Sequence, residues 1–219
     1  PADIATAIGR PITYVNDCRA FALSEAVLGA GQGYDPVIGL IIGTGLGGGI
    51  CSQSKLLTGA LGLGGEFGHV AAPATLTSAY NLPLVPCGCG RLGCAETYLS
   101  GPGMTRLALA LTGHNMTPPQ VAAGRGKGGA EDKVWAAWCA GMAEFLLGLT
   151  LNIDPEAIII GGGLSAISGL CDDLSAAMQA VQLPGYGIPK LLLAQGGAAS
   201  GARGAALAAL AKPSGSQYG

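Results

Sequence analysis

The segment Cys87-Gly-Cys-Gly-Arg-Leu-Gly-Cys94 most constrains how this chain can fold, because its three thiols can wrap around a single metal ion. Glycines between the thiols let the backbone turn tightly enough to do so. His69, in the upstream segment Gly65-Glu-Phe-Gly-His69, is the expected fourth donor. Three thiols and one imidazole close a tetrahedral zinc site, so we expect the metal to be structural. Buried, metal-free cysteines are the alternative, which the glycines and the histidine disfavour.

Composition limits the class of protein. Hydrophobic residues make up 49% and charged residues 11% of the 219 residues, which indicates a compact globular chain. A net charge of -2 with 11 scattered basic residues disfavours nucleic acid and anionic membranes as partners. We identify no apolar run long enough to span a bilayer and no signal-peptide pattern, so we expect a cytoplasmic protein. The odd number of cysteines, 7, fits a reducing compartment.

Apolar patterning predicts an α/β sheet covered by helices on both faces. Strands are expected at 12–15, 37–42, 157–160 and 190–194, with a further strand resuming at Ile50. Helices are expected at 3–9, 20–28, 104–111, 133–153, 168–181 and 198–210. Residues 56–94 and 113–129 are rich in glycine and are expected to be loops, the first of them ordered by the metal.

The run Gly43-Thr-Gly-Leu-Gly-Gly-Gly49 predicts a hairpin turn that can approach phosphates. Amides without a neighbouring Cβ can donate to phosphate oxygens, and the Thr44 hydroxyl adds another donor. The run lacks the Lys-Ser/Thr ending of a P-loop and the helix of a Rossmann fingerprint. A phosphate hairpin of the actin and hexokinase kind is the better match, and a glycine turn without function is the alternative.

Asn16 and Asp17 are expected to follow the strand 12–15. A carboxylate at a strand end can take a proton from a substrate hydroxyl, while the adjacent amide orients a sugar. A plain Asp-containing turn is the alternative. Glu66 and Glu96, on either side of the metal loop, complete a set of polar groups suited to a polyol, unless they are solvated surface residues.

Together these motifs resemble the ROK family of bacterial sugar kinases and related transcriptional repressors, over essentially the whole chain. The resemblance rests on five motifs in one order: Asn16-Asp17 with Phe21-Ala-Leu-Ser-Glu-Ala26, the run Ile41–Ile50, Gly65–His69, Cys87–Cys94 and Glu96.

The resemblance implies an actin-like ATPase (ribonuclease H-like) fold, with this chain forming mainly its large domain. Residues 1–15 would end the small N-terminal domain and its crossover, 16–197 would form the large domain, and 198–219 a C-terminal helix and tail. An Asp-x-Gly-Gly-Thr phosphate loop would lie upstream, so we expect little turnover from these residues alone. A homodimer is also implied.

The resemblance also assigns roles to residues. Asp17 would be the general base on the sugar 6-hydroxyl, and ATP would bind with Mg²⁺. The sugar contacts would be Asn16, Asp17, Glu66, His69 and Glu96. The structural Zn²⁺ would be held by His69, Cys87, Cys89 and Cys94. The nucleotide would face Gly43, Thr44, Gly45 and Gly47 with its phosphates and Gly161, Gly162 and Gly163 with its adenosine.

Within the family, Phe21–Ala26 and the spacer Leu82-Pro-Leu84 look most like N-acetylglucosamine kinases. The alternatives are a fructokinase or glucokinase, a sugar-sensing transcriptional regulator that binds DNA through an upstream domain, and a degenerate module without activity. The chain departs from the family pattern at Cys18 and Arg19, where Ala and Asn or Asp are usual, and at Gln195–Gly197, where His-Gly-Asp is frequent.

Overall fold

The computed structural model describes residues 2–211, which are built around a five-stranded mixed sheet. The strand order is β3-β2-β1-β4-β5, with β1 Val37–Ile42, β2 Leu46–Ser52, β3 Lys55–Leu56, β4 Ala157–Gly161 and β5 Lys190–Leu193. β2 pairs antiparallel with β1 and β3, whereas β4 runs parallel to both β1 and β5. The branched and leucine-rich runs of β1 and β4 fit strands that are buried on both faces.

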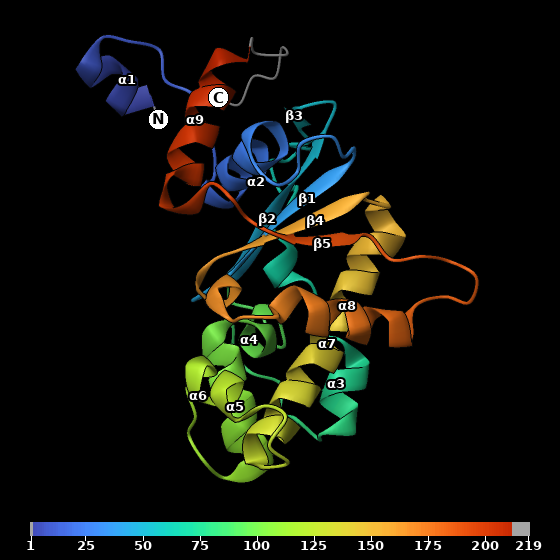
Figure 1. The fold of residues 1–219 in the computed structure, drawn as a ribbon. Coiled ribbons are helices and arrows are strands. Elements are labelled where there is room, and N and C mark those ends of the chain that lie inside the picture. The colour runs from blue at the N-terminus through green and yellow to red at the C-terminus, as the bar shows by residue number, and fades with distance from the viewer. Residues whose placement is uncertain (1, 212–219) are drawn as a thin grey trace.

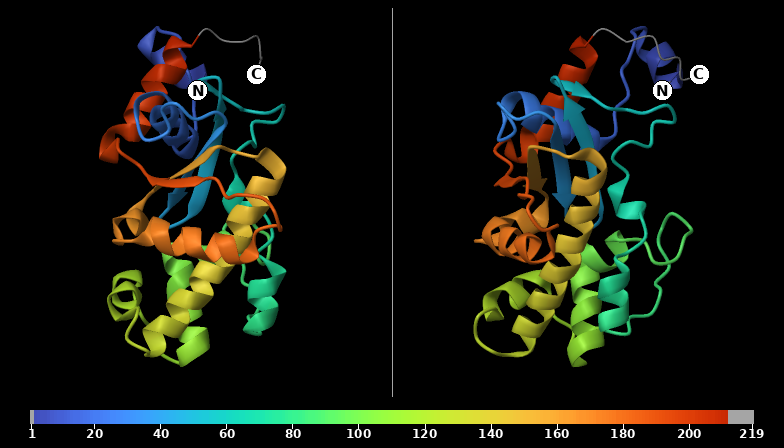
Figure 2. Two further views of the ribbon diagram at one scale, coloured as in Figure 1. Left: turned by 45° about the vertical axis from the view of Figure 1, so that its right-hand side comes forward. Right: turned by 90° about the vertical axis from the view of Figure 1, so that its right-hand side faces the viewer.

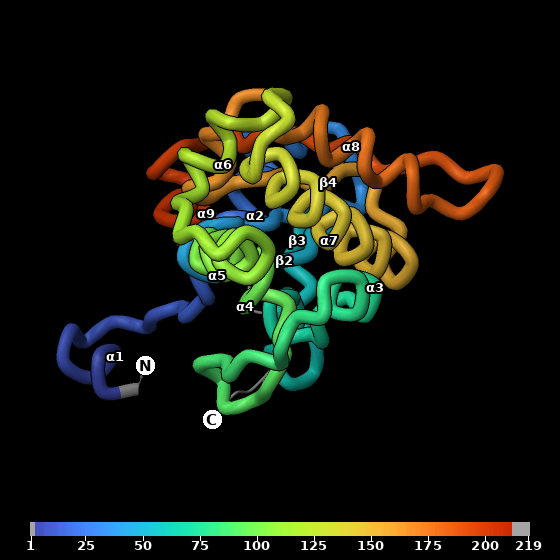
Figure 3. The backbone as a smooth tube through the Cα atoms, turned by 90° about the horizontal axis from the view of Figure 1, so that it is seen from below, coloured from blue at the N-terminus to red at the C-terminus, as the bar shows by residue number. Residues whose placement is uncertain are grey.

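Helices cover both faces of the sheet, as the sequence predicts. Figures 1 and 2 show α2 (Asp17–Leu28) and α9 (Ser200–Leu210) on one side, and α7 (Ala130–Ile153) and α8 (Leu170–Val181) on the other. The α7 side also carries α3 (Ala74–Ala79), α4 (Glu96–Leu99), α5 (Gly101–Thr112) and α6 (Pro118–Gly124). Three short 3-10 helices are η1 (Phe67–His69), η2 (Gly163–Ala166) and η3 (Gly197–Ala199). α1 (Ala2–Ile8) stands apart from these elements (Figure 3).

The two faces of the sheet pack into different clusters of buried side chains. Because successive strand residues point to opposite faces, Ile38, Leu40 and Ile42 join the larger cluster with α5, α7 and α8. Val37 and Ile159 lie in a smaller cluster with Phe21 of α2. The central strands are therefore buried from both sides, which holds the hairpin turn at one end of β1 in a fixed place.

Helix α7 corrects the expectation that no apolar run is long enough to span a bilayer. It has 24 residues, and an 18-residue window of it reaches a mean hydropathy of 1.5. Of the residues in that window 61% are buried inside the protein, and Trp138, Met142 and Leu146 have no exposed surface. The apolar residues of α7 therefore pack into the larger buried cluster of the protein.

Helix α2 lies directly on glycine backbone of the sheet. A methyl group added at Gly39 of β1 would lie 2.5 Å from the Cα of Ala22, and one at Gly49 of β2 would lie 2.8 Å from the Ala22 Cβ. Only hydrogen at these two positions allows the close approach. The first turn of α2 is thereby brought against the hairpin β1–β2.

Two expectations about local structure are wrong. Residues 12–15 are not a strand, and Asn16 and Asp17 begin α2 instead of ending a strand. A strand needs a neighbour for its backbone hydrogen bonds, and residues 11–14 are exposed beside no strand of the described sheet. The predicted loops 56–94 and 113–129 also contain short helices, α3 and α6.

Candidate active site and metal centre

Asn16 and Asp17 form the N-terminus of α2. The Asn16 Oδ1 atom accepts hydrogen bonds from the backbone N–H of Cys18, at 2.9 Å, and of Arg19, at 3.4 Å, which is ordinary N-capping. Asp17 is exposed, and its Oδ1 accepts from the Cys18 N–H at 2.8 Å. Within the described residues, the Asn16 amide nitrogen makes no hydrogen bond, and the Asp17 carboxylate bonds to its neighbour Cys18. The Asn16 amide and the exposed Asp17 carboxylate can therefore meet a ligand.

Cys18 joins this helix end to the glycine hairpin. A methyl group added at Gly47 would lie 2.9 Å from the Cys18 Sγ, so the thiol fills the space that a side chain at Gly47 would need. Burial, and next the charge of Asp17, raise the pKa of Cys18 to about 12. The thiol beside Asp17 is therefore neutral at pH 7.

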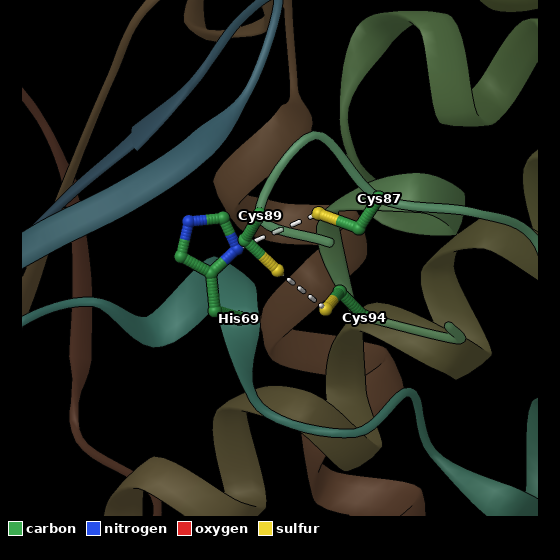
Figure 4. Close-up of side chains that lie close together, drawn as sticks. All are labelled: His69, Cys87, Cys89 and Cys94. Carbon is green, nitrogen blue, oxygen red and sulfur yellow. Dashed lines mark hydrogen bonds between the residues drawn. The ribbon is translucent and has the colours of Figure 1, made fainter. Parts of the chain in front are cut away.

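The four predicted metal donors come together between η1 and the cysteine loop, and their side chains converge in Figure 4. The donor atoms of His69, Cys87, Cys89 and Cys94 all lie within 4.8 Å of one another. Cys89 Sγ and Cys94 Sγ are 3.6 Å apart, and Cys87 Sγ and His69 Nδ1 are also 3.6 Å apart.

These separations fit a tetrahedral zinc ion. With Zn–S bonds of about 2.3 Å and Zn–N bonds of about 2.0 Å, a tetrahedron places two sulfurs about 3.8 Å apart and sulfur and nitrogen about 3.5 Å apart. Nδ1 is the imidazole atom in the cluster, which leaves Nε2 of His69 for another partner.

Glu96 lies between the metal cluster and the hairpin turn. Its Oε1 accepts a hydrogen bond from the Cys87 thiol at 2.9 Å and is 3.5 Å from His69 Nδ1. Its Oε2 is on the other side, 3.2 Å from where a Cβ at Gly45 would stand. One carboxylate thus touches both the predicted zinc donors and the predicted phosphate hairpin.

Glu66, the other predicted carboxylate, immediately precedes η1. Its Oε1 pairs with Arg19 at 3.2 Å. The Arg19 charge, which the sequence leaves unexplained, is thereby matched by a carboxylate from the predicted sugar site.

Three of the predicted nucleotide residues line one cavity of about 670 Å³: Gly43, Thr44 and Gly163. The N-terminus of α5 also lines it, and the Gly101 N–H donates to the Gly43 carbonyl at 2.8 Å. A helix N-terminus carries partial positive charge, which favours phosphate groups. The cavity therefore combines a glycine turn with an anion-attracting helix end.

The remaining predicted nucleotide residues, Gly45, Gly47, Gly161 and Gly162, do not line this cavity. Gly162 has a φ of 86° and lies so close to Ile42 that an added methyl would meet its carbonyl oxygen at 2.5 Å. It shapes the turn after β4 that carries Gly163 into the cavity wall.

Sequence reasoning missed several residues of the cavity wall, namely Gly101, Pro102, Thr105, Arg106, Pro118 and Leu164. The signal was present, because Ser100 followed by Gly101-Pro102 is a typical helix start, and Ser100 Oγ does cap α5 by accepting from Gly103 N–H at 3.2 Å. We expected the helix to begin only at Met104, which placed its N-terminus away from the turn.

The sequence matches a family model and several known proteins. The family model described as the ROK family matches residues 1–212. N-acetylgalactosamine kinase AgaK of Shewanella sp. (strain ANA-3) is 43% identical over 206 residues, 94% of this chain and 67% of the relative. N-acetyl-D-glucosamine kinase of Citrobacter koseri (strain ATCC BAA-895 / CDC 4225-83 / SGSC4696) is 36% identical, over 94% of this chain and 69% of the relative.

A solved structure shares the fold. The ROK family glucokinase from Streptomyces griseus, determined in complex with glucose and AMPPNP, superposes with a TM-score of 0.75 at 29% identity, over 94% of this chain and 70% of that chain.

Proposed function

This chain belongs to the ROK family, and on that premise we propose that it contributes the sugar site and the phosphate hairpin of a kinase that phosphorylates an N-acetylhexosamine with ATP. The two relatives named above act on N-acetylgalactosamine and N-acetylglucosamine, which differ only in the configuration at C4. The proposed acceptor is the 6-hydroxyl of one of these sugars. One observation carries the proposal. The Cys18 side chain, next to Asp17 at the start of α2, packs against Gly47 of the hairpin, which places the proposed base beside the proposed phosphate turn.

In the proposed mechanism Asp17 is the general base. Its Oδ1 is held by the Cys18 N–H, and its Oδ2 takes the proton of the sugar hydroxyl as that oxygen attacks the γ-phosphorus. The Asn16 amide nitrogen donates to a neighbouring sugar oxygen, and Glu66, His69 and Glu96 contact the other sugar groups. The Gly43–Thr44 turn and the N-terminus of α5 bind the phosphates of ATP, which carries Mg²⁺.

The four-donor cluster is proposed to hold zinc in a structural role. The metal would cross-link η1 to the cysteine loop, and its closed set of three thiolates and one imidazole leaves no position for a catalytic water. His69 would bind it through Nδ1 and present Nε2 to the sugar.

As to domain organisation, we propose that residues 16–197 form the large domain, that 1–15 lead into it from a smaller domain, and that 198–219 are a C-terminal helix and tail; residues 1 and 212–219 lie outside the described residues. The buried core shared by β1, β4, α5, α7 and α8 supports the central assignment.

The test is an assay of the protein that carries this chain, with ATP, Mg²⁺ and a panel of N-acetylglucosamine, N-acetylgalactosamine, glucose and fructose. ADP release measures turnover, and NMR of the product locates the phosphate. We expect one of the two acetamido sugars to give the highest kcat/KM, with phosphate on O6.

The variant Asp17→Asn removes the base and keeps the shape of the helix end, so we expect kcat to fall about 10²- to 10⁴-fold. Asp172→Asn, an exposed position in the first turn of α8, is the matched control and should retain wild-type turnover. Near-normal turnover of Asp17→Asn would exclude the base role, whereas sugar binding without phosphorylation by the wild type would favour the regulator.

A further inference from the structure

Arg19 is a charged residue beside the proposed sugar site to which the proposed chemistry gives no task. It is the third residue of α2, where the helix dipole disfavours a positive charge. Its side chain is only 12% exposed. A guanidinium that is this buried, at this end of a helix, requires compensating acceptors.

The hydrogen-bond acceptors of the Arg19 guanidinium come from a single short segment. Arg19 Nε donates to the Gly64 carbonyl at 2.8 Å, and Arg19 Nη2 donates to the Gly62 carbonyl and to Glu66 Oε1. All three acceptors lie within residues 62–66. The planar guanidinium fork can bind acceptors in several fixed directions at once, which a lysine ammonium on its flexible stem cannot reproduce.

No regular secondary structure fixes the segment 57–66. It contains no helix or strand, and its leucines Leu57, Leu61 and Leu63 are 56%, 78% and 64% exposed. In Figure 2 it runs along the outside of the protein from β3 to η1. Backbone hydrogen bonds tie it to β2 at Leu57 N–H to Ile50 O and at Gly48 N–H to Gly65 O. Burial of apolar surface therefore contributes little to its order, and polar contacts must hold it.

We infer that Arg19 is a positioning residue for the sugar, which fixes residues 62–66 so that Glu66 presents its second oxygen to the substrate. Oε1 of Glu66 is taken by Arg19, and Oε2 has no hydrogen bond within the described residues. A carboxylate held at one oxygen can accept a hydroxyl or acetamido N–H of the sugar at the other. Arg19 does not line the cavity at Gly43 and Thr44, so its effect is confined to the sugar.

This inference rests on the proposed function for its kinetic part. Arg19→Met removes all three hydrogen bonds at similar length, Arg19→Lys keeps the charge without the fork, and Arg10→Lys at an exposed position is the control. We expect Arg19→Met to raise KM for the N-acetylhexosamine about tenfold or more, and Arg19→Lys to raise it less. KM for ATP should stay within about twofold in all three variants, as should kcat.

Hydrogen–deuterium exchange gives a readout that needs no turnover. Peptides covering 57–66 should exchange faster in Arg19→Met than in the wild type, whereas peptides of α7 should not change. Thermal melting checks that each variant is folded.

The two proposals fail in different ways. A wild type that phosphorylates no sugar of the panel overturns the proposed kinase, and the exchange rates of 57–66 still decide whether Arg19 orders this segment. An active wild type with unchanged sugar KM in Arg19→Met overturns the positioning role, as does an equal rise of KM for sugar and ATP.

Discussion

Glu25 holds together two parts of the chain that are far apart in sequence. Its side chain has no exposed surface, and its carboxylate accepts four hydrogen bonds: from the N–H groups of Ala30, Gln195 and Gly196 and from the hydroxyl of Ser200. Burial by itself would raise the pKa of Glu25, but the bonds from Ser200, Gln195, Gly196 and Ala30 bring that pKa below its ordinary value of 4.5. A carboxylate from α2 thereby anchors the start of α9.

Replacing Glu25 by Gln should destabilise the protein by roughly 2–4 kcal/mol at pH 7, because one amide oxygen cannot serve four donors. The folded-state pKa lies below the unfolded value, so the ionised carboxylate stabilises the protein above pH 4.5 and this contribution is lost as the pH falls through the folded-state pKa.

Denaturant unfolding of wild type and Glu25→Gln across pH should therefore show a difference that shrinks below pH 4.5. Glu144→Gln, a half-buried position in α7 for which no hydrogen bond is described, is the matched control and should destabilise the protein less than Glu25→Gln at pH 7. A constant difference between pH 3 and 7 would contradict the role given to the ionised form.

The role of Glu25 could not be predicted from sequence, since Gln195 and Gly196 are 170 and 171 positions away. The Arg19 contacts were hidden for the same reason. By contrast, the metal donors were predictable because their chemistry and spacing are specific, and the structure brings the predicted four together.

At the scale of elements, the contact between α2 and β1 makes a sharp prediction about glycine. Gly39→Ala forces a methyl to within 2.5 Å of helix backbone, so we expect a loss of about 2–3 kcal/mol or more. The matched change Gly148→Ala, on α7 with no atom within 4 Å of the added methyl, should stabilise the protein by about 0.5–1 kcal/mol. Thermal melting of the pair measures both, and equal Tm values would mean that α2 can lift from the sheet.

Strong periodicity made most elements predictable. The strands at 37–42, 157–160 and 190–194 and the long helix at 133–153 are present within a few residues of their expected bounds. Short elements were missed because their patterns span too few residues. Helix α6 did carry a readable signal, the capping box Thr117-Pro-Pro-Gln120, which the surrounding glycines obscured.

For the whole molecule, the family and the class of enzyme predicted from the sequence are confirmed by the family match and the sugar kinase relatives. The residue roles remain predictions, because a fold places side chains near one another without showing which reaction they perform.

Metal removal tests whether the proposed zinc site supports sugar binding independently of the stability of the sheet. We expect a chelator to remove one zinc per chain and to weaken sugar binding before the sheet unfolds, since the metal orders η1 and the cysteine loop while the sheet has its own core. Metal analysis, calorimetric sugar titration and far-UV circular dichroism measure the three effects.

Cys89→Ser should reproduce this loss of zinc, whereas Cys171→Ser, outside the cluster, should not. Sugar affinity that survives zinc removal unchanged would disprove the coupling.

The close contact of α2 with Gly39 and Gly49 limits how α2 can move relative to β1 and β2. Because Ala22 rests on Gly39 and Gly49 with no side chain between, the helix that begins at Asp17 cannot slide or tilt without the strands that end in the hairpin turn. The proposed base and the proposed phosphate turn therefore travel as one rigid body. We therefore expect any closure around the substrates to be made by another part of the protein moving toward them.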